Sequence, residues 1–89
     1  MIAMVTGASS GFGEAISRLL VQAGYRVIGT GRRAERLAAL AGELGEQFLP
    51  LAFDVQDKAA TRAAIEGLPA AWQEVDLLVN NAGLALGLE

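Results

Sequence analysis

The hydrophobic positions along the chain form four short apolar runs separated by longer amphipathic segments. The runs lie at residues 2–5, 26–30, 48–53 and 75–79. Each run is nearly continuous in apolar residues, as in parallel strands that are buried on both faces. The segments between them repeat apolar residues at helical spacing. The pattern therefore predicts alternating strands and helices, with connections long enough for βαβ crossovers.

Three helices are predicted between the strands. The first ends before Gly24, the second covers 34–44 and ends at Gly45, and the third covers 58–68 after a capping Asp57. The apolar stripe of the first helix is expected to contain Ala15, Ile16, Leu19, Leu20 and Ala23. Its opposite, polar face is expected to contain Glu14, Ser17, Arg18 and Gln22. The inward face of the third is expected to contain Ala60, Ala64, Ile65 and Leu68.

The strand and helix alternation predicts an α/β fold with a Rossmann-type, doubly wound parallel sheet, because right-handed crossovers place helices on both of its faces. Pro50 lies inside the third apolar run. Proline cannot donate a hydrogen bond to a neighbouring strand, so this strand is expected at an edge of the sheet. Residues 1–89 are expected to form one folded unit.

Composition excludes several classes of protein. With 89 residues, 53% of them hydrophobic, the chain is neither disordered nor long enough for two domains. The net charge of −3 argues against a nucleic-acid partner. No apolar stretch approaches the ~18 residues that span a bilayer, and the N-terminus does not resemble a secretion signal. We therefore expect no membrane partner and a cytoplasmic location.

Histidine and cysteine are both absent from the sequence. Their absence excludes Ser-His-Asp and Cys-His catalysis, disulfide bonds and zinc sites of the usual kind. Carboxylates remain as potential metal ligands, and no metal site is predicted.

A glycine-rich segment, Thr6–Gly13, lies between the first strand and the first helix. Gly7 would permit a tight turn, and Gly11 and Gly13 would allow a phosphate to approach the backbone. The helix N-terminus would then direct N–H groups and its positive dipole end at the anion. The alternative is an ordinary glycine-rich turn. The residues of the predicted anion site are Gly7, Ser9, Ser10, Gly11, Phe12 and Gly13.

Two arginines, Arg32 and Arg33, follow the second strand. Dinucleotide folds that prefer NAD place an acid about 20 residues beyond the glycine loop, where it binds the ribose 2′-hydroxyl. Gly31 occupies that place here, and guanidinium groups suit a phosphate. The pattern favours the 2′-phosphate of NADP. The alternative is that Arg32, Arg33 and Arg36 form a solvated start of the second helix.

Polar residues also follow the third and fourth strands, at the edge where open α/β sheets bind ligands. Asp54 and Val55 follow the third strand, and Asp54 could accept a hydrogen bond from an adenine amino group or cap the local turn. Residues 80–83, with the sequence Asn-Asn-Ala-Gly, follow the fourth. The asparagine amides could bridge strand ends or bind a ribose, or the segment could be a plain turn.

The glycine loop, Thr6-Gly7-x3-Gly11-x-Gly13, together with Asn-Asn-Ala-Gly at 80–83, resembles the N-terminal half of the short-chain dehydrogenase/reductase family. The resemblance extends over residues 1–89. Within the family, residues 31–37 and 78–87 are most similar to the NADP-dependent 3-hydroxy acid dehydrogenases, which also accept serine or allo-threonine. The resemblance implies a sheet of order 3-2-1-4, truncated after four strands, whose fourth strand is an uncovered apolar edge.

The resemblance also implies the roles of individual residues. The glycine loop with Ser9 and Ser10 would hold the pyrophosphate and adenosine ribose, and the two arginines the 2′-phosphate. Asp54 and Val55 would contact the adenine. Asn80, Ala82 and Gly83 would line the ribose and nicotinamide side. The family transfers hydride between NADP and a hydroxyl/carbonyl pair, using a tyrosine and lysine pair with a serine, and its full-length members are expected to be homo-oligomers.

The catalytic residues that the resemblance implies are not matched in residues 1–89. The sequence holds one tyrosine, Tyr25, and one lysine, Lys58, which are too far apart to form Tyr-x3-Lys. We therefore expect no catalytic residue and no dehydrogenase activity in this chain alone. A small hydroxy-acid substrate is expected only when the other half is present. The alternatives are a standalone NADP-binding module and a truncated relic.

Overall fold

The computed structural model describes residues 1–81, which form a four-stranded parallel sheet of order β3-β2-β1-β4. The strands are β1 (Ile2–Thr6), β2 (Arg26–Gly31), β3 (Phe48–Ala52) and β4 (Leu77–Asn80). The helices are α1 (Gly11–Gln22), α2 (Ala34–Leu44) and α3 (Lys58–Glu66), with short 3₁₀ turns at Gly45–Gln47 and Ala70–Trp72. This topology confirms the predicted Rossmann-type sheet and its strand order.

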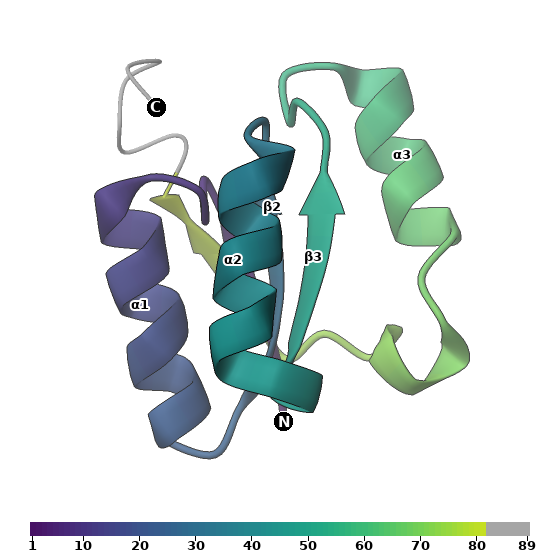
Figure 1. Cartoon of the computed structure of the whole chain (residues 1–89). Coiled ribbons are helices and arrows are strands. Elements are labelled where there is room, and N and C mark those ends of the chain that lie inside the picture. The colour runs from purple at the N-terminus through teal and green to yellow at the C-terminus, as the bar shows by residue number, and fades with distance from the viewer. Residues whose placement is uncertain (82–89) are drawn as a thin grey trace.

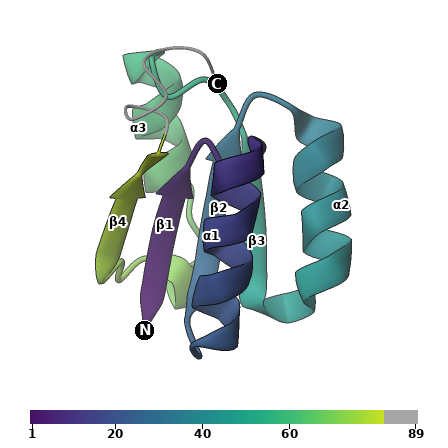
Figure 2. The same ribbon diagram turned by 90° about the vertical axis from the view of Figure 1, so that its left-hand side faces the viewer.

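Helices lie on both faces of the sheet, with α1 and α2 on one face and α3 on the other (Figures 1 and 2). The core on the α1 and α2 side contains Val5, Ala8, Val27, Leu37, Leu40 and Phe48. The core on the opposite side contains Ile2, Met4, Ile28 and Leu68. Trp72 packs against this second cluster, and the Arg26 guanidinium lies 4.7 Å from its ring centroid. Burial on both faces explains why the two central strands are so apolar.

The two outer strands of the described sheet, β3 and β4, differ in their exposed edges. Pro50 lies on β3, opposite Gly29 of the neighbouring strand β2. β3 is an outer strand of the described sheet, as predicted, so the missing N–H of Pro50 falls on its unpaired side. β4 pairs with β1 and exposes Leu77 and Leu78. The fourth strand is thus the apolar outer strand that the family order implies.

The inward face of α1 differs from the predicted stripe. Ser17 is fully buried, whereas Leu19 is 65% exposed, and Ala15 and Ala23 are also exposed. Gly13 packs directly on the loop after β1, and this contact rotates the helix so that residues 13, 17 and 20–21 face the sheet. The buried Ser17 hydroxyl donates to Gly13 O at 2.8 Å, which makes its burial tolerable.

The third helix is capped as predicted but packs less closely than predicted. The Asp57 carboxylate accepts a hydrogen bond from Ala60 N at 3.1 Å. No residue of α3 is buried, and Ile65 is 47% exposed, so this helix turns the predicted face toward the sheet without burying Ile65. Leu68, which lies beyond the helix end, supplies the buried contact instead. Ile65 stays partly exposed because it lines a hollow beside α3 in the described part of the chain.

An ion pair joins the outer surfaces of α1 and α2. Arg18 donates from Nε to Glu43 Oε2 at 2.7 Å and from Nη2 to Glu43 Oε1 at 3.0 Å. These hydrogen bonds lower the pKa of the Glu43 carboxyl below its ordinary value. A lowered pKa in the folded chain adds stability above the unfolded value, about 4.3, and this contribution is lost as pH falls through the folded value.

We therefore expect Glu43→Gln to lower the thermal midpoint at neutral pH and to change it progressively less as the solution becomes acid. The pair is exposed, so the effect is small and shrinks in high salt. Thermal unfolding followed by circular dichroism across this pH range checks the result. Glu46→Gln, in the turn after α2, is the matched control. An equal shift for both variants at all pH values would contradict the assignment.

Candidate functional site

The segments after the four strands meet at the carboxyl edge of the sheet. Figure 2 shows the arrowheads of β1, β2 and β4 pointing to the same end of the molecule, where α1 and α3 also begin. In sequence these segments are the loop after Thr6, the arginines after Gly31, the turn after Ala52 and Asn81. The structure thus gathers the predicted site residues that lie within 1–81 at one edge. Ala82 and Gly83 lie outside the described residues.

The glycine loop is closed by its own hydrogen bonds. Gly7 has a φ of 67°, a left-handed conformation that favours glycine, and Ser10 N donates to its carbonyl oxygen at 3.1 Å. Ser10 is the N-cap of α1, because its hydroxyl accepts from Gly13 N at 3.1 Å. The same hydroxyl donates to Gly7 O at 2.8 Å. The hydroxyl proton of Ser10 is therefore engaged within the loop itself.

The second and third glycines have different tasks. A Cβ atom at Gly13 would lie 2.6 Å from Ala8 Cα and still closer to the Gly7 carbonyl oxygen. The requirement for glycine at this position thus comes from the packing of α1 on the loop, which corrects the expectation that Gly13 admits a phosphate. A Cβ atom at Gly11 would meet nothing within 4 Å. Packing within the described residues therefore does not demand a glycine at 11, and the space above it suits a ligand.

The N-terminus of α1 presents backbone donors at this space. The N–H of Gly13 bonds to the Ser10 hydroxyl, and the N–H of Glu14 bonds to Ser10 O at 2.9 Å. The N–H groups of Gly11 and Phe12 precede these and have no acceptor within the helix. They coincide with the positive end of the helix dipole. This arrangement fits a phosphate group, and the Phe12 side chain beside it is 79% exposed.

The end of β2 carries the predicted arginines. Arg32 and Arg33 are exposed, and Arg33 is the N-cap residue of α2 without a capping side-chain bond. The preceding Gly31 is buried against the glycine loop. Arg36, which the sequence grouped with these arginines only in the alternative of a solvated helix start, makes a specific contact, because its Nη1 donates to Ser9 O at 3.3 Å. No local pattern indicated this contact, since Ser9 lies 27 residues earlier in the chain.

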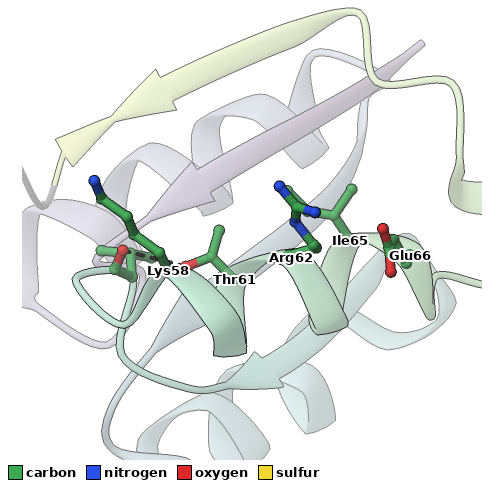
Figure 3. A pocket seen from close by; sticks show the side chains of 6 residues that line it. Lys58, Thr61, Arg62, Ile65 and Glu66 are labelled. Carbon is green, nitrogen blue, oxygen red and sulfur yellow. Dashed lines mark hydrogen bonds between the residues drawn. The ribbon is translucent and has the colours of Figure 1, made fainter.

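Asp54 and Val55 follow β3 in a tight turn. The Asp54 carboxylate accepts from Gln56 N at 2.9 Å, which supports the turn-forming alternative for this residue. Val55 lines a hollow of about 360 Å³ along α3 (Figure 3). Figure 3 shows the Lys58, Arg62 and Ile65 side chains directed from α3 toward β1 and β4. The hollow therefore begins beside the turn that was expected to contact adenine.

The two asparagines after β4 bridge separate strands and loops. Thr6 Oγ1 donates to Asn80 Oδ1 at 3.1 Å, which links the ends of β1 and β4. The buried Asn81 was not among the predicted site residues, yet its Nδ2 donates to Gly7 O and to Ser10 Oγ, each at 3.1 Å. The bridging interpretation of this motif is confirmed. Asn81 therefore ties the segment after β4 to the glycine loop next to the α1 N-terminus.

Asn81→Ala is expected to lower the free energy of unfolding by about 1–3 kcal/mol, because two buried hydrogen bonds to the loop are lost. Denaturant unfolding followed by fluorescence of Trp72 measures this loss. Asn81→Asp is the matched variant. It places a carboxylate against two oxygen atoms and is expected to destabilise the chain more than alanine does. A smaller effect for aspartate than for alanine would contradict the assigned donors.

Two other kinds of site were sought in the described part of the chain. Residues 1–81 bring together no group of three or more histidine, cysteine, aspartate or glutamate side chains with the geometry of a metal site. Over the same residues, every helix is too short or too polar to cross a lipid bilayer. The donors at the carboxyl edge remain the feature suited to a ligand.

Similarity to known proteins agrees with this geometry. The sequence profile described as short chain dehydrogenase matches residues 1–88. A Haemophilus influenzae protein named "Probable NADP-dependent dehydrogenase" is 66% identical over 87 residues, covering 98% of this chain and 34% of that protein. The NADP-dependent 3-hydroxy acid dehydrogenase YdfG of Salmonella typhi is 57% identical over 89 residues, covering 100% of this chain and 36% of that protein.

Solved structures show the same relationship. The closed form of serine dehydrogenase complexed with NADP+ superposes with a TM-score of 0.88 at 49% identity, covering 91% of this chain and 33% of that chain. The present chain thus spans about a third of the length of the relatives it matches. Fold and sequence thus agree over almost all of its residues. The chain belongs to the short-chain dehydrogenase family, whose members are oxidoreductases.

Proposed function

We propose that this chain binds NADP at the carboxyl edge of its sheet, as the cofactor-binding portion of an NADP-dependent dehydrogenase. The observation that carries the proposal is the arrangement at the start of α1. There the open space at Gly11 lies over two helix N–H groups, while Arg32 and Arg33 lie exposed after the neighbouring strand. The names of the relatives and the NADP+ complex of the serine dehydrogenase support the choice of nucleotide.

The residues fit distinct parts of the cofactor. The glycine loop, with Ser9, Ser10 and Phe12, would hold the pyrophosphate and adenosine ribose through the α1 N-terminus. Arg32 and Arg33 would bind the 2′-phosphate. The other segments at the edge would complete the site, with Asp54 and Val55 at the adenine and Asn80, Ala82 and Gly83 on the ribose and nicotinamide side. When bound, NADP supplies or accepts the hydride.

The names of the relatives support a substrate class. A 3-hydroxy acid dehydrogenase and a serine dehydrogenase both match this chain, which supports a small 3-hydroxy acid whose hydroxyl/carbonyl pair exchanges hydride with NADP. Residues 1–89 supply the cofactor side of that reaction, and we propose that they are inactive alone. We also propose that the full-length enzyme is cytoplasmic and forms a homo-oligomer. Reading the coding sequence past codon 89 for a serine and a Tyr-x3-Lys pair tests this larger assignment.

Nucleotide binding tests the central proposal directly. Isothermal titration of the 89-residue chain with NADP and with NAD, and the thermal midpoint at saturating nucleotide, give two independent readouts. A ligand that binds the folded chain alone raises the midpoint. We expect NADP to bind more tightly and to raise it more than NAD does. Equal effects of the two nucleotides, or no effect of either, would overturn the proposal.

A further inference from the structure

We propose that Ser9 supports the preference of this site for NADP by occupying the space that an acidic side chain at position 31 would need. The inference rests on the proposed NADP function. Arg32 and Arg33 would attract the 2′-phosphate by contact, whereas Ser9 acts by exclusion, as a specificity-determining residue that works through its neighbour. The two residues lie on different segments, the glycine loop and the end of β2, so their sequence separation does not suggest a relationship.

The geometry at Gly31 leaves no room for a side chain. A Cβ atom placed there would lie 2.5 Å from Ser9 Oγ, 3.1 Å from Ser9 Cβ and 3.3 Å from Ser9 N. Rotation of the hydroxyl would relieve the first contact. The other two involve the Cβ atom and the backbone, which do not move when the side chain rotates. Any residue larger than glycine at 31 therefore requires the loop itself to shift.

The loop is held in place on both sides of Ser9. Ala8 N donates to Thr30 O at 2.8 Å, which ties the preceding residue to β2. The Ser9 carbonyl accepts from Arg36 Nη1 at 3.3 Å, which ties it to α2. Ser9 is itself 3% exposed. A side chain at 31 therefore requires these held segments to move apart by a few tenths of an ångström, close to the start of α1 at Gly11.

Exclusion of a side chain at 31 has a chemical consequence. In dinucleotide-binding folds an acid at this place accepts a hydrogen bond from the ribose 2′-hydroxyl and so favours NAD. The same carboxylate would repel a 2′-phosphate. With Ser9 in place, position 31 stays without a carboxylate, and Arg32 and Arg33 are the charged residues that follow it in the chain. The preference for NADP thus depends on the packing of Ser9 against Gly31 as well as on the two arginines.

A double-mutant cycle tests the inference in the 89-residue chain. Gly31→Asp alone is expected to lower the thermal midpoint without nucleotide, since the loop must move. Adding Ser9→Gly removes both side-chain contacts and is expected to restore most of that midpoint. The ratio of NAD to NADP affinity, measured by titration, is expected to rise about tenfold in the double variant, the value of one charge-assisted hydrogen bond. Ser9→Gly alone leaves glycine at position 31, so its affinities for NADP and NAD are the reference against which the double variant is compared.

Matched variants keep the test decisive if Gly31→Asp does not fold. Gly31→Ala introduces the same contacts without a charge and is expected to be rescued by Ser9→Gly in thermal midpoint. Gly29→Ala is the control, because its Cβ would meet the Phe48 ring, and Ser9→Gly is not expected to rescue it.

The inference and the proposed function fail in different ways. The inference is overturned if Gly31→Asp or Gly31→Ala is as stable as the parent chain, or if Ser9→Gly rescues neither. It is also overturned if Gly31→Asp alone shifts the preference to NAD as far as the double variant does. Failure of the proposed function would show instead as an unmodified chain that does not prefer NADP, whatever the midpoints of the variants without nucleotide.

Discussion

Arg32→Ala is expected to weaken NADP binding by about 10- to 100-fold, because a charge-assisted hydrogen bond to a phosphate contributes about 1.5–3 kcal/mol. NAD lacks the 2′-phosphate, so its affinity is expected to change little. The ratio of the two dissociation constants, measured by isothermal titration, therefore isolates the 2′-phosphate contribution from any general damage to the fold. The exposed position of Arg32 after β2 makes such damage small.

Two neighbouring substitutions sharpen this test. Arg32→Lys keeps the charge but loses the planar pair of donors, so we expect a loss for NADP that is smaller than with alanine but still measurable. Arg33→Ala, one residue further on and also exposed, asks whether both guanidinium groups contribute. If Arg32→Ala weakened NADP and NAD equally, the residue would have a general role and the 2′-phosphate assignment would be wrong.

Gly13→Ala is expected to lower the free energy of unfolding by roughly 3 kcal/mol, at the upper end of the range for overpacking. The added methyl group would meet the Gly7 carbonyl oxygen and Ala8 Cα, which are backbone atoms that no side-chain rotation can move. For a chain of this size, such a loss lowers the thermal midpoint by roughly 12–24 °C. Denaturant and thermal unfolding measured by circular dichroism check the two values.

Gly11→Ala is the matched control, two residues earlier in the same helix turn. Its methyl group would meet nothing within 4 Å, so the stability of the chain is expected to stay within about 0.5 kcal/mol of the parent. The methyl group would instead project into the space above the helix N–H groups and weaken NADP binding. The two glycines should therefore separate, one affecting stability and the other affecting affinity. Similar losses of stability for both would show that the packing role of Gly13 is wrongly assigned.

The local patterns of the sequence were sufficient for most of the fold. The bounds of α2, the glycine after each of the first two helices, the Asp57 cap and the outer position of Pro50 all agree with prediction. Each depends on residues close together in the chain: helical or strand periodicity, a capping side chain, or a missing N–H. Such signals act over one or two helical turns, so the structures they favour depend little on the packing of distant segments.

The errors occurred where a distant segment decides which face of a helix is buried. Apolar periodicity placed Leu19 inside and Ser17 outside, but the contact of Gly13 with the loop after β1 reverses them. Ile65 lies on the expected face of α3, yet the hollow beside it leaves it 47% exposed. Hydrophobicity alone therefore predicted that these helices are amphipathic, without predicting the rotation of α1 about its axis or how closely α3 packs.

The local sequence pattern was sufficient to predict that a strand, a glycine-rich turn and a helix N-terminus lie together, with arginines after the next strand. The role of each residue in this arrangement could be seen only in the folded chain. Gly13 packs, Gly11 leaves space, Asn81 and Arg36 hold the loop, and Ser9 fills the place of an acid at 31. These roles depend on distances between segments that are far apart in the chain. Periodicity and spacing indicate which residues belong to the same helix or strand. The distance between two helices or strands depends on how their side chains pack, and a local sequence pattern does not predict that packing.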